Sequence, residues 1–129
     1  MHAPASTRRA ALLTLGLLAA TVGGSAMAQA NAWPSKPLHL IVGFPAGSSP
    51  DLTARALADP LEKALGQPVV VENRVGAGGN IGADAVAKAR DGHTIGLMIN
   101  GNLTIARLLN PAVRYDPLKD LAPVSLVGV

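Results

Sequence analysis

Short apolar runs alternate with helix-like stretches along residues 38–127 of the chain. The runs with strand character are Leu38 to Phe44, Val69 to Glu72, Thr94 to Ile99 and Pro123 to Val127. Strands that alternate with helices favour right-handed βαβ units. The pattern therefore predicts an α/β fold with a parallel sheet and helices on both of its faces.

The first predicted helix carries signals at both of its ends. Ser49 is expected to be its N-cap, Pro50 suits a first helical position, and Gly66 is a natural stop. Pro60 interrupts the pattern because it lacks an N–H group and clashes one turn back, which predicts a kink or an early end there. The expected apolar face consists of Leu52, Leu57, Leu61 and Leu65.

Two further helices and one isolated turn are predicted. The second helix opens near Asn80, and the third runs from Leu103 to Leu109, where Asn110-Pro111 ends it. A single helical turn is expected between Tyr115 and Leu121. The inward positions predicted for the second helix are Ile81, Ala85, Val86 and Ala89.

A glycine-dense turn, Gly76 to Gly82, joins the second strand to the second helix. Such a turn leaves backbone N–H groups unpaired at the positive end of a helix dipole, where an anion binds. Its spacing is G-x-G-x-x-x-G, not the dinucleotide spacing G-x-G-x-x-G, and the next strand ends without an acid. A small-anion site is therefore favoured. Glycines that merely permit a tight turn, and a nucleotide site, are the alternatives.

Three polar turns, Pro45–Ser49, Arg74–Asn80 and Asn100–Asn102, each follow a predicted strand. Ligands of parallel sheets bind at the carboxyl ends of the strands, so these turns are candidates for one binding site. Asp51 stands beside the first turn. Its carboxylate has two interpretations, contact with a ligand amine or ordered water, or a helix-start acid alone. Arg74 is expected to tether its loop.

The residue types that catalysis needs do not converge in the predicted fold. Ser48 and Ser49 have no basic partner. His39 lies mid-strand, and His93 lies at the amino end of a strand, away from the site. The chain has no cysteine and no metal-ligand spacing. We therefore expect no enzymatic activity, no metal and no cofactor; a nucleotide-binding α/β enzyme is the lower-ranked alternative.

Residues 1–30 have the organisation of a secretory signal peptide. Arg8 and Arg9 precede an apolar run of thirteen residues, Ala10 to Val22, and small residues lead to a predicted cleavage after Ala30. A run of this length is too short to cross the ~30 Å hydrocarbon core of a bilayer. The arginine pair partly matches a twin-arginine signal, and an ordinary Sec leader fits at least as well. A periplasmic protein that does not itself span the membrane is predicted.

The composition of residues 31–129 excludes a nucleic-acid surface. Nine Lys and Arg stand against eight Asp and Glu, and the aromatic residues are Trp33, Phe44 and Tyr115. Basic residues interleaved with stacking rings are missing from this sequence. About 99 residues bury only ~60–65% of their unfolded surface, which is modest for a sheet covered on both faces. The final strand-like segment is followed by no turn or helix, and we expect a truncated product of a longer gene.

Three motifs follow the signal peptide in order: LIVGFPAGSSPDLTAR, VVVENRVGAGGNIGADAVAKA and YDPLKDLAPVSLVG. From Trp33 onward the chain resembles the substrate-binding receptors of tripartite tricarboxylate transporters, the Bug family. The resemblance implies a two-lobed fold of the type II periplasmic-binding-protein kind. It also implies capture of a small carboxylate, such as a di- or tricarboxylate or an amino acid, for delivery to membrane subunits. Residues 31–129 would then form only the first part of lobe one.

The resemblance also implies the ligand-binding positions. Carried over by position, they are Phe44, Ala46, Gly47, Ser48, Ser49 and Asp51 in the first loop, Gly76, Ala77, Gly78, Gly79 and Asn80 in the second, and Asn100, Gly101, Asn102 and Thr104 in the third. Two departures stand out. Ser48 occupies the second position of a usual Gly-Gly pair, where it adds a hydroxyl donor or crowds the ligand. Pro60 replaces a good helix former. The alternative to a working receptor is a non-functional truncated fragment of one.

Overall fold

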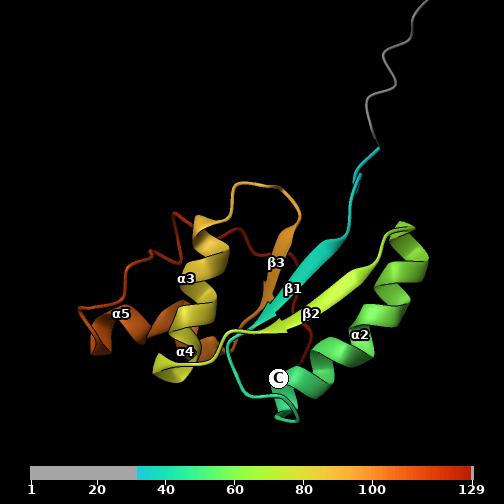
Figure 1. Ribbon diagram of the computed structural model, residues 1–129. Helices are drawn as coiled ribbons and strands as arrows, with labels where there is room; N and C mark the ends of the chain where they lie inside the picture. Colours follow the sequence, from blue (N-terminus) through green and yellow to red (C-terminus); the bar gives the residue numbers. More distant parts are fainter. Residues whose placement is uncertain (1–31, 129) are drawn as a thin grey trace, which may run out of the picture. The chain divides into compact units, whose positions relative to one another are not determined.

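A computed structural model describes residues 32–128, and the predicted signal peptide over residues 1–30 lies outside this range (Figure 1). Strands and helices alternate along the described chain. In order they are β1 (Leu38–Val42), α2 (Ser49–Leu65), β2 (Val69–Asn73), the short 3-10 helix η2 (Ala77–Gly79), α3 (Asn80–Lys88), β3 (Thr94–Leu97), α4 (Asn100–Thr104) and α5 (Ala106–Leu109). The α/β fold class is confirmed.

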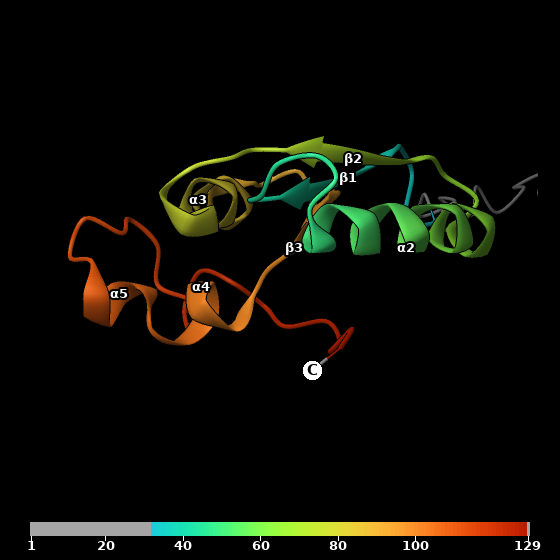
Figure 2. The same cartoon turned by 90° about the horizontal axis from the view of Figure 1, so that it is seen from below.

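The strands form a parallel sheet of order β2-β1-β3, so β1 is its central strand (Figure 1). Figure 2 shows α2 running along one side of this sheet. Leu38, Leu40 and Val42 alternate onto that side, where they pack with Ala54 and Ala58 of α2 in the main hydrophobic core. The small alanine side chains let the helix lie close to the strands, and burial of these apolar side chains stabilises the pair.

Helix α3 covers the opposite face of the sheet. A Cβ atom placed on Gly96 would lie 2.8 Å from Cγ2 of Val86 in α3, so this position of β3 faces that helix. Its neighbours Ile95 and Leu97 pack into the core beneath α2. Because successive residues of a strand point to opposite faces, α2 and α3 lie on different sides. The predicted parallel sheet with helices on both faces is confirmed.

The predicted early end of the first helix at Pro60 is wrong. Helix α2 continues to Leu65 and ends at Gly66, which has φ 69° and donates its N–H to the carbonyl of Glu62. Leu61 and Leu65, beyond the proline, pack against the main core. Their burial offsets the roughly 3 kcal/mol that an internal proline costs.

The start and inner face of α2 also differ from the prediction. The N-cap is Ser48, one residue earlier than expected, and Pro50 therefore lies at the second helical position. Leu52 is 59% exposed, and the buried positions of the helix are Asp51, Ala54 and Ala58. Small residues occupy the contact line because the helix approaches the sheet closely.

The inward face predicted for the second helix is partly wrong. The buried residues of α3 are Gly82, Ala83 and Ala87, whereas Ile81 is half-exposed. A Cβ atom on Gly82 would lie 2.8 Å from Cα of Gly43 at the end of β1, so only glycine fits at this crossing. Because the backbones of α3 and of the end of β1 approach so closely, the inner face of α3 accommodates small residues rather than the bulkiest apolar ones.

The final third of the described chain departs most from the expected pattern. The predicted helix over Leu103 to Leu109 is two short helices, α4 and α5, separated at Ile105. The predicted strand Pro123 to Val127 is wrong, because these residues adopt no regular structure in the described chain and Val124 is highly exposed. The predicted turn after Tyr115 is present, and in it the N–H of Asp120 donates to the carbonyl of Asp116.

Within residues 32–128, no helix is both long and apolar enough to cross a bilayer.

Candidate functional site

The three predicted loops meet at Gly79, at the carboxyl-terminal edge of the sheet. A Cβ atom on this glycine would lie 2.9 Å from Cζ of Phe44 and 3.0 Å from Oδ1 of Asn102. Phe44 belongs to the loop that follows β1, and Asn102 lies in α4, the short helix that occupies the third predicted loop. The fold therefore brings one residue from each loop into van der Waals contact around a glycine, which leaves room for both neighbours.

Asp51, in the first turn of α2, anchors the first loop. Its side chain is 1% exposed; Oδ2 accepts the N–H of Gly47 at 2.8 Å and Nε–H of Arg55 at 3.0 Å, and Oδ1 accepts from Asn73 at 2.8 Å. The hydrogen bonds from Arg55, Gly47 and Asn73 hold the pKa of Asp51 far below its ordinary value, so the carboxylate is ionised at neutral pH. The carboxylate therefore faces the first loop and β2 rather than solvent.

Asn73, the last residue of β2, is a residue of this site that the sequence analysis missed. Its Nδ2 donates to the carbonyl of Phe44 at 2.9 Å and to Asp51 at 2.8 Å, while its Oδ1 accepts from Arg55 at 3.3 Å. The side chain thereby ties the first loop to the strand beside it. The sequence did contain one signal for this role. Asn73 is a side-chain amide at the carboxyl end of a strand, which is the edge of a parallel sheet where ligands bind.

The second loop presents backbone rather than side chains. Gly76, Gly78 and Gly79 have φ angles of 139°, 64° and 92°, a region in which glycine is unstrained. No side chain caps the N-terminus of α2 or of α3. At α3 the glycine turn supplies acceptors, since the N–H groups of Gly79 and Ile81 donate to the carbonyl of Gly76 and that of Asn80 to the carbonyl of Ala77. At α2 the first N–H groups have no acceptor within the helix, and Pro50 contributes none, so the N–H groups of Ser49 and Asp51 are the candidate donors. The turn requires its glycines, but the prediction that it leaves N–H groups unpaired is wrong for Gly79, Asn80 and Ile81.

The hydroxyl of Ser48, at the position where the resemblance implies a glycine, points into its own loop. Its Oγ donates to the carbonyl of Pro45 at 2.6 Å, and its φ of −72° suits any residue. The preceding Gly47, with φ +82°, is where glycine is needed. The side chain at position 48 therefore completes a local turn.

The remaining predicted site residues also lie at the carboxyl-terminal edge of the sheet, but their contacts assign them no particular role. Thr104 donates its hydroxyl to the carbonyl of Asn100 within α4. Gly101 is half-buried, and the others are exposed: Ala46, Ser49, Ala77, Gly78 and Asn100. Such exposure leaves their backbone groups accessible.

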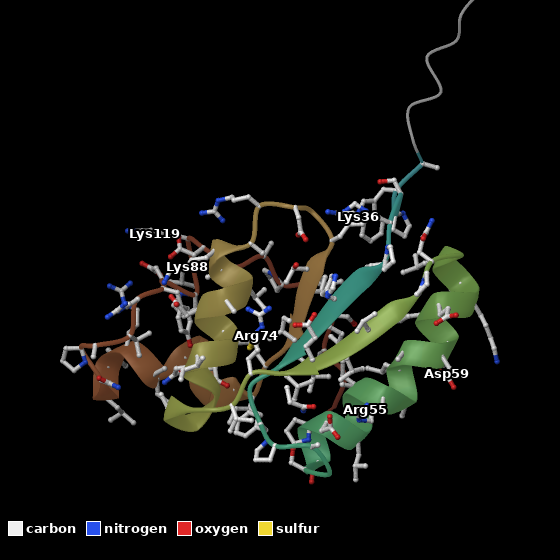
Figure 3. The ribbon with its side chains drawn as sticks, in the orientation of Figure 1. Lys36, Arg55, Asp59, Arg74, Lys88 and Lys119 are labelled. Atoms are coloured by element: carbon white, nitrogen blue, oxygen red, sulfur yellow. The ribbon has the colours of Figure 1, made fainter. Side chains whose placement is uncertain are left out.

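The cations near the loops already have partners. Arg55 on α2 pairs with Asp51, and Arg74, just after β2, donates to Oε2 of Glu72 at 3.1 Å (Figure 3). The backbone N–H of Arg74 donates to the carbonyl of Val42, which fastens the start of the second loop to β1. A bound anion would consequently be held mainly by neutral donors.

The two histidines of the described chain, His39 and His93, lie outside the loop cluster, as predicted. His93 is buried at the amino end of β3, where its Nε2 accepts the N–H of Ser35 at 3.1 Å and its Nδ1–H donates to the carbonyl of Asp91 at 2.9 Å. His39, in the middle of β1, contacts Glu72 on β2. Among the described residues, no group of three or more His, Cys, Asp or Glu side chains has the arrangement of a metal site.

Residues 53–128 match the family described as "Tripartite tricarboxylate transporter family receptor". The chain is 48% identical over 119 residues to Protein BugT of Bordetella pertussis, covering 91% of this chain and 36% of that protein. It is 46% identical over 120 residues to a UPF0065 protein of Bordetella bronchiseptica, with 92% and 35% covered. The chain therefore belongs to the tripartite tricarboxylate transporter receptor family. It spans about a third of the length of these curated relatives.

Solved structures of similar proteins agree with this assignment. MatC from Rhodopseudomonas palustris with bound malate superposes with a TM-score of 0.69 and 38% identity, covering 74% of this chain and 33% of that one. Rpa4515 from R. palustris with adipate has a TM-score of 0.63 and 38% identity, over 67% and 29% of the chains. A structure described as a periplasmic transporter has a TM-score of 0.64 and 41% identity, over 68% and 30%. The periplasmic-binding-protein-like fold is thus confirmed for the part of lobe one described.

Proposed function

We propose that the protein is a periplasmic receptor that captures a small carboxylate for the membrane subunits of a tripartite transporter. The observation that carries this proposal is the convergence of the three loops around Gly79, in a chain of this receptor family. Residues 31–129 would form the first part of lobe one, behind the predicted signal peptide. The proposed ligand contacts are the loop positions named above from the family resemblance, with the buried side chains of Asp51 and Asn102 in supporting roles.

Charge balance at the loops favours a carboxylate held by neutral donors. Arg55 and Arg74 are already paired with Asp51 and Glu72, so neither brings an unpaired charge to the edge of the sheet. A helix N-terminus stabilises a nearby anion by about 0.3–1 kcal/mol, and several backbone N–H groups together suit a carboxylate oxygen. Malate and adipate in the two R. palustris structures are both dicarboxylates.

Asp51 itself has a supporting role in this proposal. Its carboxylate accepts three hydrogen bonds that fix Gly47 and Asn73, and the first loop is thereby held in place before any ligand arrives. Preorganised donors bind more tightly because less conformational entropy is lost on binding. The proposed role is capture without chemical change, since the loops offer hydrogen-bond donors and no proton-transfer pair among the described residues.

Carboxylates are expected to raise the melting temperature of the protein. At tenfold excess over Kd, a ligand adds about 1.4 kcal/mol to the free energy of unfolding. For a domain of this size that corresponds to a shift of roughly 5–10 °C. Scanning calorimetry with malate, adipate, citrate and glutamate at millimolar concentrations measures it. The matched controls are malamide and adipamide, which keep the carbon skeletons and lack the charge, with sodium chloride added to equal ionic strength. An equal response to acids and amides, or to none of the acids, would refute carboxylate capture.

A further inference from the structure

We propose that Tyr115 is a positioning residue of this site, whose hydroxyl locks the second and third loops together through Asn80 and Asn102. The inference rests on the proposed function, because it concerns the same loops. Tyr115 lies 35 residues after Asn80 and 13 after Asn102, in the segment that follows α5. Figure 1 shows this segment returning past α3 after α5, so the fold brings it back to the site.

The hydroxyl of Tyr115 meets a polar group from each loop. It lies 2.7 Å from the backbone carbonyl of Asn102 and 3.0 Å from Oδ1 of Asn80. Its single hydrogen is donated to one of these oxygens at a time. The Nδ2 group of Asn102 closes the network, donating to Oδ1 of Asn80 at 2.8 Å and to the carbonyl of Gly78 at 2.9 Å. The start of α3, the glycine turn and the start of α4 are therefore cross-linked by one set of hydrogen bonds.

Burial separates this role from ligand contact. Tyr115 is 3% exposed and Asn102 is 2% exposed, so neither side chain is accessible to a ligand at the sheet edge. The ring of Tyr115 packs against Ala83 and Ala87 of α3. The ring therefore contributes to packing, whereas the hydroxyl contributes hydrogen bonds to the second and third loops. Burial, with a smaller effect of Asp84, raises the pKa of Tyr115, which keeps the hydroxyl protonated and able to donate.

The two halves of the site are held by different networks. Asp51 and Asn73 hold the first loop, and they share no hydrogen bond with Tyr115, Asn80 or Asn102 among the described residues. The second and third loops are thus joined into one wall of the site, and the Tyr115 hydroxyl holds their relative positions through its hydrogen bonds. Loss of that hydroxyl should disturb the wall while leaving the first loop in place.

Substitution Tyr115→Phe removes the hydroxyl and keeps the ring. In spectra of the ¹⁵N-labelled whole chain without ligand, we expect amide shifts to change at residues 76–80 and 100–102, with little change at residues 44–48. Malate affinity should fall about threefold to tenfold, the range for one lost hydrogen bond. Thr53→Val is the matched control, because it deletes an exposed α2 hydroxyl that donates within its own helix. Shift changes confined to α3 residues 83–87, with malate affinity as in Thr53→Val, would overturn the inference and leave only a packing role.

A second measurement leaves Tyr115 unchanged. It is the only tyrosine of the chain, so ¹³Cζ-labelled tyrosine gives one resonance that reports on this hydroxyl. We expect Asn80→Ala to move this resonance, since it removes one of the two oxygens that the hydroxyl faces. An unmoved resonance would contradict the network. If the resonance moves and malate shifts no loop amide of the unsubstituted chain, the network stands and the proposed function fails.

Discussion

Replacing Gly43 with alanine is expected to remove a large share of the stability of the domain. The added Cβ atom would lie 2.6 Å from both Cα and the carbonyl oxygen of Gly79. Both neighbours are backbone atoms, so no side-chain rotation relieves the clash, and β1 is the central strand of the sheet. Overpacking of this kind costs roughly 1–3 kcal/mol and more where backbone must move. That is a large share of the ~5–15 kcal/mol that stabilises a typical domain.

Urea unfolding followed by circular dichroism measures the loss of stability in Gly43→Ala. The matched control is Gly101→Ala in α4, where the nearest atom to the added Cβ is Cδ1 of Ile99 at 3.8 Å. That contact is ordinary, and alanine is the better helix former, so the control should unfold at a midpoint equal to or above that of the parent chain. Equal midpoints for the two variants would show that β1 and the glycine turn do not approach as closely as described.

Replacing Asn73 with alanine is expected to weaken carboxylate binding by tenfold or more. The substitution removes the Nδ2 donor from the carbonyl of Phe44 and from the buried carboxylate of Asp51. A buried acceptor that loses its donor costs about 1–3 kcal/mol. The first loop then loses its tie to β2, and its donors are no longer held in place before the ligand binds.

Titration of the Asn73→Ala variant with malate, followed by amide shifts, gives the affinity directly. Asn110→Ala is the matched control, because it deletes the same amide group from an exposed position where it accepts only the N–H of Ala112. The control should bind malate like the parent chain. Asn73→Ala and Asn110→Ala variants of equal affinity would contradict a role for Asn73 in holding the first loop.

Much of the architecture follows from the alternation of apolar runs and helical periodicity. The order of strands and helices, the parallel sheet and the placement of three polar loops at one edge were all predictable, because they depend on local pattern and on the handedness of βαβ units. The strand predicted at Pro123 to Val127 failed for the same reason, since local pattern alone provides no neighbouring strand for its backbone.

The parts of the site that hold it together were not predictable from pattern. Asn73 and Tyr115 act through partners far away in the sequence, such as Phe44 and Asn102, and the spacing of residues along the chain does not reveal such pairs. The inner faces of the helices failed for a related reason. At Gly82 the distance between backbones decides which residue fits, whereas the periodicity of apolar residues favoured the bulkier Ile81.

The central claim is that a carboxylate binds where the three loops meet around Gly79. An amide-resolved titration of the ¹⁵N-labelled chain with malate tests it most directly, because it reports both binding and location. The account predicts saturable shifts at residues 44–49, 76–80 and 100–102, with malamide producing none of them. Saturable malate shifts that lie elsewhere, for example around His93 at the opposite edge of the sheet, or loop amides that do not respond to malate, would contradict it.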